Sequence, residues 1–236
     1  MFSFTSKVRF SETDIREQLA LPSIINYFQD CSEFHSQSVG SGAGSLGQYA
    51  WILNSWQIVI NQYPKRNETI QICTKPHKFK GIEGYRNFLI QNEQGETLVY
   101  ANSIWTYFDM EQMRPARITQ DQFDCYTLEE PLDMEYAPRK ISLKNVEDTD
   151  FTVAYKTTVQ RSQFDMFGHM NNCQYVSIAY NCLPEDYALR QVRVEYKKSA
   201  LLHDEIVVKY TVIEERILVL LTNAAGEIFA VVELIK

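Results

Sequence analysis

Apolar and polar positions alternate along most of this chain in short blocks typical of strands, and two blocks have helical spacing instead. In the first half, strand-like Thr5–Phe10 precedes a loop at 14–21, a helix at 22–39, and strands near 51–61, 68–78, 84–93 and 97–108. Pro22 suits the first helical turn, and Gly40 suits the position just past the helix end. The pattern predicts one helix followed by a long antiparallel sheet.

The second half repeats this order. A strand at 151–160 leads into a loop at 162–170, a helix at 171–183 that ends before Pro184, and strands near 189–198, 205–214, 216–222 and 227–235. At an offset of 151 residues (165 − 14), Asp14 pairs with Asp165 and Cys31 pairs with Cys182. We therefore predict an α+β protein with two copies of a sheet wrapped around a central helix. The copies occupy 1–112 and 151–236, and residues 113–150 form an extended, proline-containing linker.

Composition and charge narrow the function. The net charge of −7 argues against a nucleic-acid partner. The chain has no apolar run of 18 residues, which argues against a membrane span, and its first residues lack the features of a signal peptide. Five widely spaced cysteines without a C-x-x-C pair are typical of reduced thiols, and we expect a cytoplasmic protein. The four histidines have no metal-ligand spacing, so we expect no metal and no other cofactor.

Candidate chemistry is concentrated before the second helix, in the segment Asp165-Met-Phe-Gly-His169-Met-Asn171-Asn172. Asp165 could act as general base or nucleophile, although an Asp here could also simply cap the turn. His169 could orient a carbonyl or carry a proton. Asn171 and Asn172 are expected to cap the helix, and Asn171 also ranks as a catalytic candidate. Backbone N–H groups from Gly168 to Asn171 could form an oxyanion site.

The first copy of this segment lacks most of that chemistry. Asp14 is retained, but Gln18, Ala20 and Leu21 stand where the second copy has His169, Asn171 and Asn172. Apolar residues at a helix mouth favour binding of an apolar ligand over proton transfer, with a purely scaffolding role as the alternative. The first copy is therefore expected to bind and the second to react.

Two other motifs carry little weight. Residues 42–47 match G-x-G-x-x-G, but they follow a helix and precede a strand, the reverse of a dinucleotide site. The chain has no G-x-S-x-G elbow, which removes the serine-hydrolase route.

The pattern D-x-x-G-H-x-N-N-x-x-Y resembles that of the hotdog-fold thioesterases. The duplicated arrangement resembles that of the acyl-(acyl-carrier-protein) thioesterases of bacteria and plants. Four further segments share this resemblance: Arg9-Phe-Ser-Glu-Thr-Asp14, Leu21-Pro-Ser-Ile-Ile-Asn-Tyr-Phe-Gln29, Tyr63-Pro64 and Arg114-Pro115-Ala-Arg117. This resemblance implies two tandem hotdog folds and a hydrolase that releases free fatty acid from acyl-acyl carrier protein (acyl-ACP) in fatty acid biosynthesis. It also implies that the N-terminal copy houses the acyl chain, with Ile24, Phe28, Trp51 and Trp56 as candidate substrate-binding residues.

The chain departs from the family pattern at two positions. Phe167 stands where the family has Asn in D-x-N-x-H, and Ser199 with Ala200 follows Tyr196-Lys197-Lys198 where the family has Glu, sometimes followed by Cys. The Gly168-His169 form is closer to single-hotdog acyl-CoA thioesterases, so an acyl-CoA thioesterase is one alternative. An acyl-binding module that has lost catalysis is another. Ser199 could order a water, or it could be an ordinary surface serine.

The implied partner is an acidic carrier protein, and basic residues could steer its docking. The candidates are Lys75, Lys78, Lys80, Arg86, Arg114, Arg117, Arg139 and Lys140. The pattern leaves a monomer and a homodimer both open, and it does not specify the preferred acyl chain length.

Overall fold

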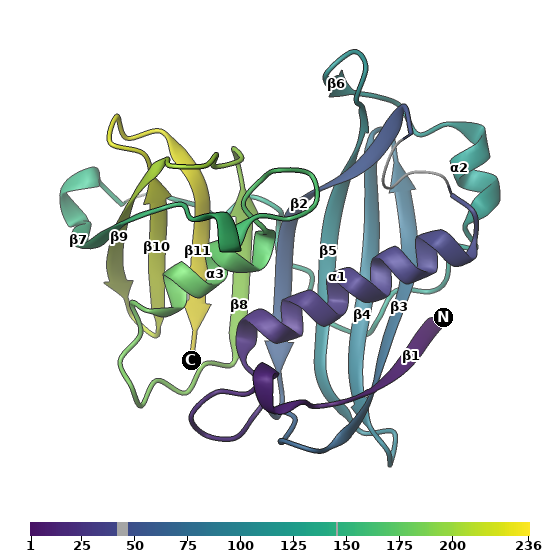
Figure 1. Ribbon diagram of the computed structural model, residues 1–236, viewed down its shortest axis with the longest axis horizontal. Coiled ribbons are helices and arrows are strands. Elements are labelled where there is room, and N and C mark those ends of the chain that lie inside the picture. Colours follow the sequence, from purple (N-terminus) through teal and green to yellow (C-terminus); the bar gives the residue numbers. More distant parts are fainter. Residues whose placement is uncertain (42–46, 145) are drawn as a thin grey trace. The chain divides into compact units, whose positions relative to one another are not determined.

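The computed structural model describes residues 1–41, 47–144 and 146–236 (Figure 1). The glycine-rich motif at 42–47 therefore lies outside the described residues except for Gly47. The chain divides into two compact units, Met1–Ala137 and Pro138–Lys236. Among the described residues, no helix combines the length and the hydropathy needed to cross a bilayer.

The first unit is an antiparallel sheet with one long helix across it (Figure 1). Its strand order is β1-β3-β4-β5-β2, and the short β6 pairs with β5. The elements are β1 (Phe2–Lys7), the 3-10 turn η1 (Phe10–Glu12), α1 (Leu21–Ser38), β2 (Tyr49–Ile60), β3 (Thr69–Lys80), β4 (Glu83–Asn92), β5 (Thr97–Asp109), β6 (Arg114–Pro115) and α2 (Gln120–Cys125).

The second unit repeats the arrangement with a shorter helix. Its strand order is β8-β11-β10-β9-β7, again antiparallel. The elements are η2 (Asp148–Asp150), β7 (Thr152–Thr158), η3 (Arg161–Gln163), α3 (Asn172–Tyr180), β8 (Gln191–Tyr196), β9 (Glu205–Ile213), β10 (Arg216–Thr222) and β11 (Ile228–Ile235). The predicted architecture, a long antiparallel sheet around a helix in each of two copies, is confirmed.

Two predicted elements have a boundary that differs by more than two residues, and one helix was not predicted. The first strand begins at Phe2 and ends at Lys7 instead of spanning 5–10, because Phe10–Glu12 closes into a 3-10 turn. The second helix ends at Tyr180, three residues earlier than predicted, because Cys182 N–H bonds Ala179 O in a tight turn. Helix α2 lies in the segment 113–150, where the weak periodicity predicted no helix.

Helix α1 is the centre of the first core. Pro22 lies in its first turn, and Gly40 follows its end in the left-handed region at φ 65°. Its buried residues are Leu21, Ile24, Ile25, Tyr27, Phe28, Cys31 and Ser32. Burial of an aliphatic or aromatic side chain contributes about 1.5–3 kcal/mol. The helix is therefore held mainly by the sheet that surrounds this face.

Buried polar side chains fix the chain that follows the first sheet. Asn87 is fully buried, and its Oδ1 accepts hydrogen bonds from Leu132 N–H (3.0 Å) and Tyr136 O–H (2.9 Å). Gln57 donates to Glu135 O and accepts from Ala137 N–H, both at 2.9 Å. Residues 131–137 are thus attached to the first sheet without forming a helix or strand of their own.

Candidate active site

The loop before α3 is closed by the side chain of Asp165. Its Oδ1 accepts hydrogen bonds from Phe167 N–H (2.9 Å) and His169 N–H (3.2 Å), and its backbone N–H donates to His169 O (2.9 Å). Gly168 lies in the left-handed region at φ 75°, which favours glycine. Asp165 therefore shapes the loop, as an Asp at a turn often does. Its second oxygen accepts no hydrogen bond from any described residue.

His169 is exposed, and its ring makes no hydrogen bond to any residue that the structure describes. The neighbouring Met166 and Phe167 are also exposed, at 78% and 53%. The imidazole is thus accessible from solvent, on a loop that also exposes two large apolar side chains.

The backbone N–H groups from Gly168 to Asn171 all have partners inside the protein. Gly168 donates to Asp165 O (3.2 Å) and His169 to Asp165 Oδ1 (3.2 Å). Met170 donates to Ala200 O (3.3 Å), and Asn171 donates to Gln163 O (2.8 Å). An oxyanion at any of these groups would have to displace or share an existing acceptor.

Asn171 caps α3. Its side-chain oxygen accepts from Cys173 N–H at 2.9 Å, which satisfies one of the N–H groups that a helix start leaves without a partner. Asn172 is the first residue of the helix, and its carbonyl accepts a hydrogen bond from Tyr196 O–H at 3.0 Å.

Two tyrosines, Tyr175 buried and Tyr196 half-buried, connect the segment around Ser199 to this helix start. Tyr175, on α3, accepts Ala200 N–H at 2.8 Å, and Tyr196, at the end of β8, donates to the Asn172 carbonyl. The two rings pack edge to face with centroids 5.6 Å apart. Burial raises the pKa of both phenols, so both hydroxyls stay protonated at neutral pH.

These contacts place the exposed Ser199 next to the loop. Ala200 donates to Tyr175 and accepts from Met170, so both of its backbone groups bind elements of the candidate site. The sequence analysis did not predict that Tyr175 would bind the backbone of Ala200. The only indication in the sequence was that Tyr175 is the final Tyr of the pattern D-x-x-G-H-x-N-N-x-x-Y.

The candidate substrate-binding residues lie inside the first unit, and only some of them meet. Phe28 packs against Trp56 with ring centroids 5.9 Å apart, and both rings contact Phe88. Ile24 is fully buried on the same helix as Phe28. Trp51 belongs to a different group of rings, stacked on Phe79 at 5.6 Å. The Trp56 indole N–H is buried without a hydrogen-bond partner among the described residues.

Arg86 was expected to contribute to carrier docking, and the structure excludes this. Only 7% of the residue is exposed, and its guanidinium donates to His35 Nδ1 (2.8 Å) and Thr74 Oγ1 (3.3 Å) and lies over the Tyr126 ring. Burial and the nearby guanidinium lower the pKa of His35 to about 4, so its ring is neutral and can accept this hydrogen bond. A charged side chain inside the fold cannot meet a partner's surface.

No group of three His, Cys, Asp or Glu side chains is placed to hold a metal ion within 1–41, 47–144 and 146–236.

Comparison with protein families gives two successive matches, separated by residues 127–144. Residues 1–126 match the model of the acyl-ACP thioesterase N-terminal domain, and residues 145–231 match that of the C-terminal domain. Among individual proteins, a chloroplastic acyl-[acyl-carrier-protein] hydrolase of Cuphea viscosissima is 24% identical in an alignment that covers 84% of this chain and 51% of that protein. A chloroplastic palmitoyl-acyl carrier protein thioesterase of Gossypium hirsutum is 23% identical over 84% of this chain and 52% of its own length. The chain thus spans about half the length of these relatives.

Solved structures share the fold. An acyl-ACP thioesterase from Bacteroides thetaiotaomicron superposes with a TM-score of 0.89 at 20% identity, over 99% of this chain and 96% of that one. The 12:0-ACP thioesterase of Umbellularia californica superposes with a TM-score of 0.83 at 17% identity, over 99% and 95%. At this identity the likeness establishes the arrangement of elements.

Proposed function

Because the chain belongs to the acyl-ACP thioesterase family, we propose that it hydrolyses acyl-ACP to free fatty acid and carrier protein, as a step of fatty acid biosynthesis. The observation that supports the proposal most directly is the placement of three polar residues around the start of α3. The exposed His169 and the Asp165 carboxylate, which has one oxygen without a described partner, belong to the loop before α3, and the exposed Ser199 precedes Ala200, which is bonded to Met170 and Tyr175. No cofactor enters the proposal.

Each polar group has a task in this proposal. Asp165 uses the oxygen that the loop does not occupy to accept a proton from water. His169 orients the thioester carbonyl or donates the proton that converts the departing thiolate into the free thiol. Asn171 holds the helix start, and Ser199 hydrogen-bonds the water.

The oxyanion is assigned to the backbone around Gly168. Three of the four N–H bonds there are long, 3.2–3.3 Å. Two of these long bonds, from Gly168 and Met170, end on neutral carbonyls. A developing negative charge competes well for those two donors, since hydrogen bonds to charged groups are about twice as strong as neutral ones.

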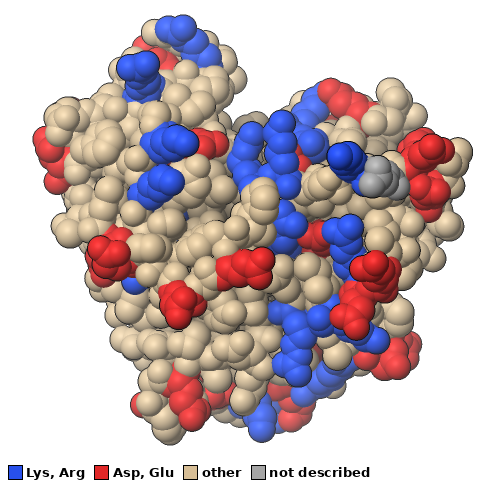
Figure 2. All heavy atoms as spheres, turned by 180° about the vertical axis from the view of Figure 1, so that it is seen from behind, with Lys and Arg blue, Asp and Glu red and all other residues tan. Residues whose placement is uncertain are grey.

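Division of labour between the halves is part of the proposal. Residues 1–112 bind the acyl chain, with Ile24, Phe28, Trp51 and Trp56 as its contacts. Residues 113–150 connect the halves, and residues 151–236 carry the reaction. The family's substrate is an acyl group on a carrier protein, and we propose that exposed Lys and Arg side chains such as those in Figure 2 steer the acidic carrier. Five cysteines without a disulfide support a reducing compartment such as the cytoplasm.

A hydrolysis panel tests the function. Purified protein is given acyl-ACP and acyl-CoA of several chain lengths, and release of thiol is followed. Faster turnover of acyl-ACP than of acyl-CoA is the expected result. A clear preference for acyl-CoA would instead favour the acyl-CoA alternative that the Gly168-His169 form suggests. Tight acyl binding without hydrolysis above background would refute both.

Matched variants test the site. His169→Asn should lower turnover by about 10²–10⁴-fold, the usual contribution of a group that transfers protons. His203→Asn changes another exposed histidine of the same unit and should leave turnover unchanged. Asp165→Asn should reduce turnover, whereas Asp14→Asn, the same change in the first copy, should not. Full activity in both His169→Asn and Asp165→Asn would remove these assignments.

A further inference from the structure

The first unit contains a structural counterpart of the candidate active site. Asp14 Oδ1 accepts from Arg16 N–H (2.9 Å) and Gln18 N–H (3.3 Å), as Asp165 Oδ1 accepts from Phe167 and His169. Glu17 has φ 57°, matching Gly168 at 75°. The backbone of the two loops is therefore the same, although the side chains differ.

The strand-end segment beside the loop is matched as well. Leu19 N–H donates to Pro64 O at 2.7 Å in the first unit, and Met170 N–H donates to Ala200 O in the second. This equivalence places Tyr63 where the second unit has Ser199, and Lys65 where it has Leu201. The residues around the two corners can thus be compared position by position.

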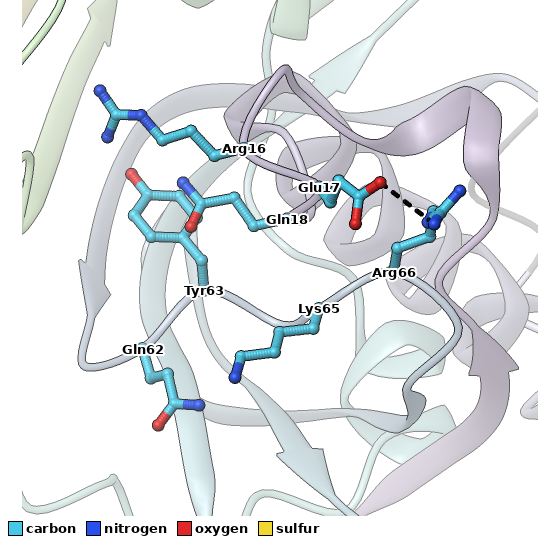
Figure 3. A pocket seen from close by; sticks show the side chains of 7 residues that line it. All are labelled: Arg16, Glu17, Gln18, Gln62, Tyr63, Lys65 and Arg66. Carbon is cyan, nitrogen blue, oxygen red and sulfur yellow. Dashed lines mark ion pairs between the residues drawn. The ribbon is translucent and has the colours of Figure 1, made fainter.

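In the first unit this corner is an open pocket of about 540 Å³. Seven residues line it: Arg16, Glu17, Gln18, Gln62, Tyr63, Lys65 and Arg66. Figure 3 shows Lys65 extending toward Gln62, while Glu17 and Arg66 face each other. Its size is within the range of small-ligand sites, which is about 300–1,000 Å³.

The charge of the pocket is opposite to that of the protein. The seven residues include three cations and one acid, a net charge of +2 (3 − 1), whereas the chain as a whole carries −7. Glu17 forms an ion pair with Arg66 at 3.1 Å, so the one acid of the lining is already compensated. The Gln62 amide adds hydrogen-bond donors to the lining, whereas the Gln18 amide already donates to Asp14 Oδ2 at 3.2 Å.

We propose that this pocket is an anion site that binds a phosphate ester, with Arg16 and Lys65 as its principal cationic contacts. A phosphate has several acceptor oxygens and a concentrated charge, and guanidinium and ammonium groups together match both properties. The second unit has Phe167 and Leu201 at the positions of Arg16 and Lys65, so its corner cannot bind a phosphate in this way. The duplicated corner therefore has one copy with the candidate reactive groups and one copy with the cationic residues.

Binding can be measured without turnover, so the test is independent of the proposed hydrolysis. Calorimetric titrations at about 20 mM salt would use 4′-phosphopantetheine, pantetheine without phosphate, and inorganic phosphate. We expect 4′-phosphopantetheine to bind and pantetheine to bind much more weakly. Affinity should fall steeply at about 500 mM salt, because screening removes most of the attraction. Binding of inorganic phosphate as tight as that of phosphopantetheine would show that the phosphoryl group alone is recognised.

Variants locate the binding. Lys65→Ala and Arg16→Ala should each weaken phosphopantetheine binding about tenfold or more, the usual effect of losing one charged hydrogen bond. Lys144→Ala, an exposed lysine of the second unit, is the matched control and should have no effect. All three sites are on the surface, so folding should be retained, and a thermal melt checks this. Equal binding of pantetheine, or affinity unchanged in Lys65→Ala and Arg16→Ala, would overturn the proposal.

Discussion

Removal of one hydroxyl from Tyr175 should damage both the stability and the activity of the second unit. In Tyr175→Phe the N–H of Ala200 loses its acceptor at 2.8 Å, and Ala200 is fully buried, so water cannot replace it. A buried N–H without a partner costs about 1–3 kcal/mol. For a chain of this length each kcal/mol lowers the melting temperature by about 2–4 °C, so we expect a decrease of about 2–12 °C.

The activity should fall because Ala200 connects the 197–200 segment to the loop. Lys197 and Lys198 remain bonded to Phe229 O, but without the Tyr175 contact Ala200 itself is joined to the loop by the Met170–Ala200 bond, which is long at 3.3 Å. Misplacement of a catalytic group by about 1 Å can cost about 10²-fold in rate. We therefore expect a clear decrease in kcat for acyl-ACP with a smaller change in KM.

Tyr155→Phe is the matched control. The Tyr155 hydroxyl donates to Ile178 O at 2.6 Å, on the same helix but away from the loop. It should lower the melting temperature and leave kcat unchanged. A thermal melt and steady-state hydrolysis of acyl-ACP, measured for both variants, distinguish a positioning role of Tyr175 from a purely structural one. If Tyr175→Phe melts like the wild type and keeps its kcat, the positioning role of this tyrosine is wrong.

Three further results are expected. Gly168→Ala should cost about 1–2 kcal/mol from its positive φ alone, because a Cβ there would meet nothing within 4 Å; denaturant titration measures this, and an unchanged midpoint would contradict it. Asn87→Ala should cost about 1–3 kcal/mol and speed limited proteolysis within 131–137, since Leu132 N–H and Tyr136 O–H lose a buried acceptor; an unaltered digestion pattern would refute the attachment. The folded-state pKa of His35, about 4, lies below its ordinary value, so the unfolded chain binds the extra proton first and stability should fall as pH drops from about 6.5 to about 4. His35→Gln should flatten that slope in melts recorded across the window, and a slope identical to the wild type would exclude His35 as its source.

The architecture was predictable from the sequence because it depends on periodicity, which is a local property. Apolar and polar residues alternate along the strands, and α1 has a proline near its start and a glycine after its end. Each element can therefore be recognised from about ten residues of sequence. The first strand was misplaced because Phe10 is apolar like a strand residue, although it belongs to a 3-10 turn and is 79% exposed. An exposed apolar residue gives no local sign of its exposure.

The parts of the site that join distant segments were not predictable in the same way. Tyr175 and Ala200 are 25 residues apart, and nothing in their spacing says that a hydroxyl meets a backbone N–H. The pocket requires Arg16 and Lys65 to approach from two segments whose register is set by Leu19 and Pro64. Arg86 was wrongly expected at the surface for a related reason. A basic residue in a strand is usually exposed, and only the pairing of the strands in the sheet determines that Arg86 faces the interior.

The matching backbone of the loops closed by Asp14 and Asp165 has a consequence for redesign. Because each Asp folds its loop through backbone N–H groups, the neighbouring side chains are free to change without altering the frame. The tripeptides 16–18 and 167–169 should therefore be exchangeable as grafts, and the first copy offers a ready scaffold on which a second set of reactive groups could be installed.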